Sequence, residues 1–110
     1  MAESLSVTRY AAIHAASSGD NAAVAAVEGA RIRVLDCLLI ASDTVTVRFE
    51  SSAGGAALTG QMQLAANGGF ASGFNPEGHF QTEAGEALNL ELSEAVSVDG
   101  WIVYKEVTEI

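Results

Sequence analysis

Few residues of this chain are of types that carry out chemistry: it has one cysteine and two histidines. A cysteine nucleophile needs a partly exposed site that stabilises the thiolate. Cys37 instead lies within Leu-Asp-Cys-Leu-Leu-Ile, the most apolar run of the sequence. We therefore expect a buried thiol that packs like a small hydrophobic side chain, and no catalytic residue.

Carboxylates are the next candidates for chemistry. Glu77, His79 and Glu83 lie close together and could bind a cation, but their spacing matches no established metal site. Glycoside hydrolysis needs a carboxyl group whose pKa is raised in a cleft. The glutamates that follow are flanked by polar positions of an expected strand face: Glu83, Glu86, Glu91 and Glu94. A solvated acidic face is the expectation, with no metal, no cofactor and no enzymatic activity.

Aromatic side chains offer a different kind of site. Trp101 and Tyr104 lie on the expected last strand, where they could stack on a sugar or pack against a partner, and packing is the more frequent role. The glycine pairs form no phosphate-binding motif between a strand and a helix. We predict partner or oligomer contacts at six positions: Leu5, Val7, Arg9, Tyr10, Trp101 and Tyr104.

Charge restricts the partners. Fourteen acidic and five basic residues give a net charge of −9, which repels nucleic acid and anionic membranes. The N-terminus lacks the layout of a signal peptide, and no apolar run approaches the ~20 residues that span a bilayer. A lone cysteine forms no internal disulfide, so folding in a reducing cytoplasm is expected.

The strands that position these residues are predicted from the alternation of apolar and polar residues along the chain. Leu88, Leu90 and Leu92 share one face of an expected strand, and the alternation over residues 44–50 predicts another, with Val45 and Val47 inward. Residues 31–42 carry apolar side chains on both parities. That pattern predicts a central strand covered on both faces, one by the sister sheet and the other by a loop or a neighbouring subunit.

Turns should separate these strands. Asp99-Gly100 between two apolar runs predicts a tight hairpin, and turns are expected at Asn67-Gly68-Gly69 and at residues 75–78. Residues 51–60 have the composition of a flexible loop. Residues 21–28 could form a short helix, but strand is favoured over helix across the region 10–30.

The expected architecture is all-β: an antiparallel β-sandwich or jelly roll of about eight strands with no long helix. Residues 1–6 are predicted to form a flexible arm and residues 7–110 a single domain. Much of the apolar content is alanine and only seven residues are aromatic, so the core should be thin. A thin core favours completion against a second subunit.

Several segments, in order, resemble a group of small proteins of tailed bacteriophages. They span residues 10–107 and include Ala-Ser-Ser-Gly-Asp-Asn, Ala-Leu-Thr-Gly-Gln-Met, Phe-Asn-Pro-Glu-Gly-His-Phe and Gly-Trp-Ile-Val-Tyr-Lys-Glu-Val. The most specific segment is Thr-Glu-Ala-Gly-Glu-Ala-Leu-Asn-Leu, which precedes the aromatic final strand. The group is similar to virion structural proteins, jelly-roll capsid decoration (cement) proteins above all.

The resemblance implies a non-enzymatic protein on the outer surface of a phage head, synthesised in the cytoplasm of a bacterial host. Its partners would be the major capsid protein and itself, as a homotrimer or alternatively a dimer. Residues 1–10 are expected to lie along the shell. Two other readings remain open: a minor tail or fibre-associated adhesive module, and a carbohydrate-binding sandwich that uses Trp101 or Tyr104.

Overall fold

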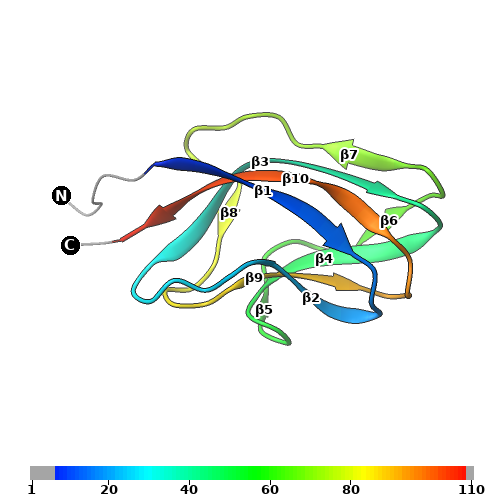
Figure 1. The fold of residues 1–110 in the computed structure, drawn as a ribbon, viewed down its shortest axis with the longest axis horizontal. Coiled ribbons are helices and arrows are strands. Elements are labelled where there is room, and N and C mark those ends of the chain that lie inside the picture. The colour runs from blue at the N-terminus through cyan, green and yellow to red at the C-terminus, as the bar shows by residue number, and fades with distance from the viewer. Residues whose placement is uncertain (1–6, 109–110) are drawn as a thin grey trace.

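The computed structural model describes residues 7–108, which form strands and turns and no helix (Figure 1). The ten strands are β1 (Thr8–Ala15), β2 (Gly19–Val24), β3 (Arg31–Ala41), β4 (Val45–Ser51), β5 (Ala56–Ala57), β6 (Met62–Leu64), β7 (Gly69–Ala71), β8 (Phe80–Gln81), β9 (Leu88–Leu92) and β10 (Val98–Val107). Within residues 7–108 there is accordingly no helix that could cross a membrane.

The strands form two packed antiparallel sheets, which confirms the predicted sandwich. One has the order β1-β10-β3-β7, with β8 also on β3; the other has the order β2-β9-β4-β5, with β6 also on β4. The pairing is nested: the first strand pairs with the last (β1 with β10), and the second pairs with the one before the last (β2 with β9). The inner strands continue the pattern, β3 with β7 and β4 with β6. This is the order of a jelly roll. The expected eight strands become ten because β5 and β6 share one position in the sheet and β7 and β8 share another.

The core lies between the sheets. Leu88, Leu90 and Leu92 of β9 are buried as the alternation predicted, and Val45 and Val47 of the neighbouring strand β4 are buried as well. Aromatic packing is sparse: the rings of Phe49 and Phe80 lie 5.2 Å apart between centroids. Aliphatic side chains therefore provide most of the burial, as the composition indicated.

The two-sided apolar pattern of β3 has a different cause from the one predicted. Tyr104 pairs with Val34 and Val103 pairs with Asp36, so Leu35 is an extra residue that forms a β-bulge. Val34 points into the core before the bulge and Cys37 after it, which switches the inward parity along the strand. Ile40, which shares parity with the buried start of the strand, is consequently 43 % exposed. In the single chain the outer face of β3 is therefore open at Ile40, and its cover by a neighbouring subunit stays a prediction.

The predicted Asp99-Gly100 hairpin is also wrong. β10 runs through this dipeptide without a turn, and Gly100 lies opposite Leu39 of β3. A Cβ atom at Gly100 would lie 1.7 Å from the carbonyl oxygen of Leu38, so the glycine serves a close backbone approach. The chain reverses earlier, between β9 and β10 over residues 93–97.

The other predicted turns fare better. Asn67 has a φ of 60°, and the amide of Gly78 donates to the carbonyl of Asn75 at 2.9 Å to close the proline-containing turn. Residues 19–24 form β2, which settles the helix-or-strand alternative for that part in favour of strand. The expected loop at 51–60 includes the short strand β5.

Candidate functional site

The outer face of the β1-β10-β3-β7 sheet is the most distinctive surface of the molecule. The strand registers align Ala12, Trp101, Leu38 and Ala71 in one row that crosses all four strands. These positions alternate with residues of the core, so their side chains point away from the interior. The row therefore lays small and large apolar groups across the outside of a sheet.

Further apolar groups lie on either side of this row. The next row places Tyr10 opposite Val103, and Tyr10 is 80 % exposed. On the other side lies Ile40, next to the polar pair His14–Asp99, whose side chains are hydrogen-bonded. Trp101 at the centre is 40 % exposed. An aromatic and aliphatic surface of this kind on a sheet face is typical of a protein-contact site.

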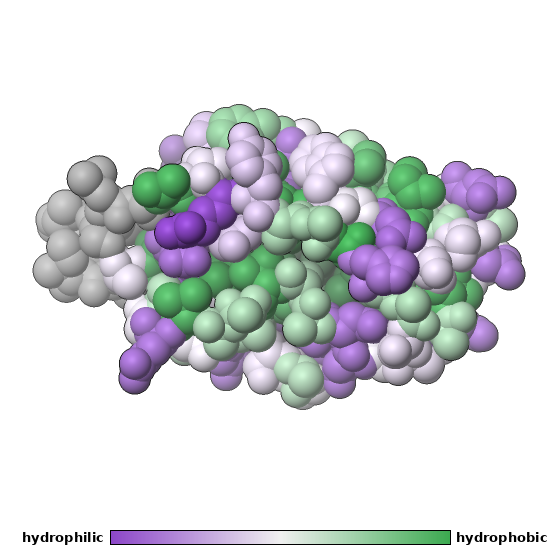
Figure 2. All heavy atoms as spheres, viewed as in Figure 1, coloured by the Kyte–Doolittle hydropathy of each residue, from purple (hydrophilic) through white to green (hydrophobic). Residues whose placement is uncertain are grey.

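Three of the six predicted contact residues border or belong to this surface. Val7 is exposed immediately before β1, and Tyr10 and Trp101 lie on the outer face. In Figure 2, green and pale-green residues lie across the side of the molecule that carries β1 and β2, interrupted by purple ones.

The other three residues lie elsewhere. Arg9 lies on β1, with its Nε atom 3.4 Å from Glu106 Oε2. Tyr104 is on the opposite face of β10 from Trp101 and packs against the core, so these two aromatics do not form one platform. Leu5 lies outside the described residues.

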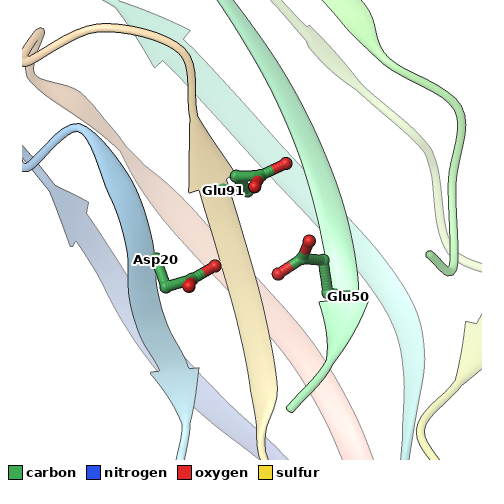
Figure 3. A group of neighbouring side chains, drawn as sticks. All are labelled: Asp20, Glu50 and Glu91. Carbon is green, nitrogen blue, oxygen red and sulfur yellow. The ribbon is translucent and has the colours of Figure 1, made fainter. Parts of the chain in front are cut away.

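The second sheet presents a contrasting outer face. Asp20 of β2, Glu50 of β4 and Glu91 of β9 point toward one another, with one oxygen from each within 4.8 Å of the others (Figure 3). Arg48 joins them: its Nη2 is 2.8 Å from Glu50 Oε2 and its Nε is 3.2 Å from Glu91 Oε1. Asn89 completes the network by donating to Asp20 at 2.9 Å and to Glu50 at 3.0 Å.

Glu50 is the buried centre of this network. Its side chain is fully covered, and burial raises its pKa, but hydrogen bonds with Arg48, Asp20, the Gly54 amide and Asn89 outweigh burial and hold the pKa below its ordinary value. Clustered carboxylates are ligands for hard cations. Here a guanidinium already contacts two of the three, so the arrangement is an ion-pair network in which three carboxylates share one arginine.

The other chemical candidates are not assembled into a site. Cys37 is buried, which confirms that expectation, and burial raises the pKa of its thiol. His79 bonds through Nε2 to the carbonyl of Gly73 at 2.8 Å, and Glu83 lies 3.9 Å from Arg31. Among residues 7–108, the three-carboxylate cluster on the second sheet is the only grouping with metal-ligand geometry, and it excludes the Glu77–His79–Glu83 trio.

A shallow hollow of ≈ 290 Å³ borders the ion-pair network. It is lined by Ser18, Gly19, Thr46, Val47, Arg48, Gln61, Glu91, Leu92 and Ser93. No aromatic residue is among them, so this hollow has no stacking platform for a sugar ring.

Sequence reasoning missed both outer faces as units. Arg48 and Glu50 alternate with buried residues of β4, so their outward direction was readable. Their meeting with Asp20 depends on the registers between β4, β9 and β2, which bring together residues far apart in the chain. The outward positions of Ile40 and Leu38 were hidden by the bulge at Leu35.

Comparisons of this chain with protein-family models, curated proteins and solved structures found no match.

Proposed function

We propose that this protein is a non-enzymatic capsid decoration protein that binds the outer surface of a phage head and stabilises contacts between major capsid proteins. The observation that carries the proposal is the contrast between the two faces of the sandwich. The face around Trp101 is largely apolar and suited to contact, whereas the face around Glu50 carries three carboxylates and one arginine. The ordered resemblance to phage virion segments supports the same conclusion.

Many identical, modest contacts are sufficient for this role. A shell under internal pressure is stabilised when added subunits bridge its joints, and repeated weak interfaces add up by avidity. The net charge of −9 keeps unbound copies soluble. The protein would act on the shell as a homo-oligomer, a trimer or a dimer.

Quantitative mass spectrometry of purified particles tests the proposal. Hundreds of copies per particle, near the count of the main shell protein, are expected of a decoration protein. A handful of copies would move the protein to the tail, and complete absence from particles would overturn a virion role.

Binding of purified protein to undecorated phage heads tests whether the outer face of the first sheet makes the contact. Ile40→Glu places a charge on the outer face of the first sheet and should weaken binding at least tenfold. Thr46→Glu places the same charge on the outer face of the second sheet and is the matched control. Equal binding by both variants would contradict a contact at the first sheet.

A test of the N-terminal arm must delete fewer residues than 1–10. Thr8, Arg9 and Tyr10 pair with β10, so their removal would damage the sheet. Deletion of residues 1–6 should abolish head binding and leave the fold intact; undiminished binding would remove the arm from the proposal.

One observation favours a second function, carbohydrate binding. Tyr10 and Trp101 are diagonal neighbours on β1 and β10 and share the outer face, so their rings could hold one sugar. Glycan-array binding that Trp101→Ala abolishes would favour this function. The absence of binding to any glycan would exclude it.

A further inference from the structure

The sandwich has four sheet edges, and three of them carry features that discourage pairing with another chain. β7 with β8 and β5 with β6 end their sheets in strands of two or three residues. The edge strand β2 has a bulge between Ala22 and Val24, and its Asn21 amide bonds to the backbone carbonyls of Ser17 and Leu90. Short strands, bulges, charged side chains and side chains bonded to the backbone of an edge strand all hinder the addition of another strand.

The fourth edge, β1, has none of these features. It is eight residues long, and its register with β10 is regular from Thr8 to Ala15. It contains no proline, lysine or carboxylate. Within residues 7–108, β1 pairs with β10 alone, so the backbone groups on its outer side have no strand partner. A long, regular edge of this kind is a template for another strand.

We infer that the partner of this edge is the β1 strand of a second copy, paired antiparallel about a two-fold axis. Any register that places a residue opposite its own equivalent keeps both apolar outer faces on the same side. The two most central registers have Ala11 opposite Ala11 and Ala12 opposite Ala12. In either register the centre consists of small side chains, which allow close approach. The first sheets of two molecules would then form one continuous sheet, and the apolar rows around Trp101 would join.

Charge favours a second copy in spite of the acidity of the whole chain. Arg9 is the only residue of β1 with a full charge, and neither register places it opposite its own equivalent. The acids of the adjacent strand are already partnered within the chain, Glu106 by Arg9 and Asp99 by His14. Two chains of net charge −9 would thus meet at an edge where both neighbouring acids have a side-chain partner within their own chain.

This inference deepens the proposed function by naming the self-contact, and it selects the dimer. A two-fold antiparallel strand pair is closed by two copies and leaves no β1 edge for a third. It rests on the free edge alone, so its test needs no phage particle and can fail while head binding succeeds.

The first test is the mass of the protein in solution by sedimentation equilibrium from 1 to 100 µM. The expected mass is twice the 11.3 kDa of one chain. Ala12→Lys adds a charge at the centre of the edge and should weaken dimerisation at least tenfold. Ala71→Lys adds the same charge in the same row at the opposite end of the sheet, and should dimerise like the wild type.

Hydrogen exchange of the wild type gives a readout that needs no variant. Amides within residues 8–15 should become more protected as the concentration rises through the dimer range. A cysteine at position 11 or 12 should form an intermolecular disulfide in the matching register, since opposed Cβ atoms lie roughly 4.5–5.5 Å apart.

Three results would overturn the inference. They are a monomer at 100 µM, a trimer, or an equal loss of dimer in Ala12→Lys and Ala71→Lys. If the wild type is monomeric and Ala12→Lys abolishes head binding, the edge pairs with a strand of the shell protein instead.

Discussion

Glu50 shows how a single carboxylate is kept charged inside this molecule. Burial alone would favour its neutral form, yet the guanidinium of Arg48 and the amides of Asn89 and Gly54 surround its oxygens. Removing the charge would leave those donors with a weaker acceptor. The network therefore stabilises the second sheet only while Glu50 is ionised.

This predicts an acid-dependent loss of stability. Because the folded-state pKa of Glu50 lies below its ordinary value of 4.5, its contribution is complete above about that pH and is lost as pH falls through the lower folded value. Glu50→Gln should reduce the free energy of unfolding at pH 7 by about 1.5–3 kcal/mol, the range for hydrogen bonds to a charged group. Urea unfolding at pH 7 and pH 3 measures both effects.

The difference between wild type and Glu50→Gln should shrink toward pH 3. Glu94→Gln, at an exposed glutamate in the turn before β10, controls for the loss of one negative charge. A difference that stays constant from pH 7 to pH 3 would contradict the role of the Glu50 charge.

At the scale of the element, the bulge in β3 decides which side chains belong to the core. Ile32 and Leu39 have opposite parity but both are buried, because Leu35 shifts the alternation between them. Ile32→Ala and Leu39→Ala should each lower the free energy of unfolding by about 2–5 kcal/mol, whereas Ile40→Ala should cost under about 1 kcal/mol. Chemical denaturation of the three variants tests this order. A large loss of unfolding free energy in Ile40→Ala would show that Ile40 is packed, as a strand covered on both faces requires.

The close approach of β10 to β3 at Gly100 leads to a further prediction. Its position opposite β3 leaves no room for a side chain, so Gly100→Ala forces the backbones of two central strands apart. We expect a loss of about 1–3 kcal/mol or more, as for other overpacked interiors. A Cβ atom at Gly60 would have no neighbouring atom within 4 Å, and Gly60 has no positive φ, so Gly60→Ala is the matched control. Equal melting temperatures for both variants would contradict the close approach.

Local patterns predicted the strands well where one face is dry, as in Leu88–Leu92 and Val45–Ser51. They failed where a long-range contact sets the local conformation. Asp99-Gly100 has the composition of a turn, but its glycine is required by the neighbouring strand. The bulge at Leu35 likewise appears only when β10 is laid beside β3.

The candidate surfaces were predictable in part for the same reason. Tyr10 and Trp101 were named from their residue types, and the structure places both on one face. Tyr104 was named with them, yet it lies three residues after Trp101 on a strand and therefore points the other way. The ion-pair network needed three strands in register, which no local pattern contains.

At the scale of the whole molecule, β10 joins the first sheet together. It pairs with β1 on one side and with β3 on the other, along the length of both strands. A chain that ends at residue 97 should therefore remain unfolded, with no sigmoidal thermal transition by circular dichroism. A chain shortened to residue 108 keeps every described strand and is the control; cooperative melting of the 97-residue chain would contradict the central role of β10.

The nested pairing also has a consequence during synthesis. β1 leaves the ribosome first but finds its partner only when β10, near the end of the chain, emerges. Until then the unpaired β1 and the apolar residues of β3 are exposed, and they could associate with nascent chains on neighbouring ribosomes of the same mRNA. Correct assembly of the first sheet would thus depend on rapid synthesis through β10, or on a chaperone that holds the early strands apart.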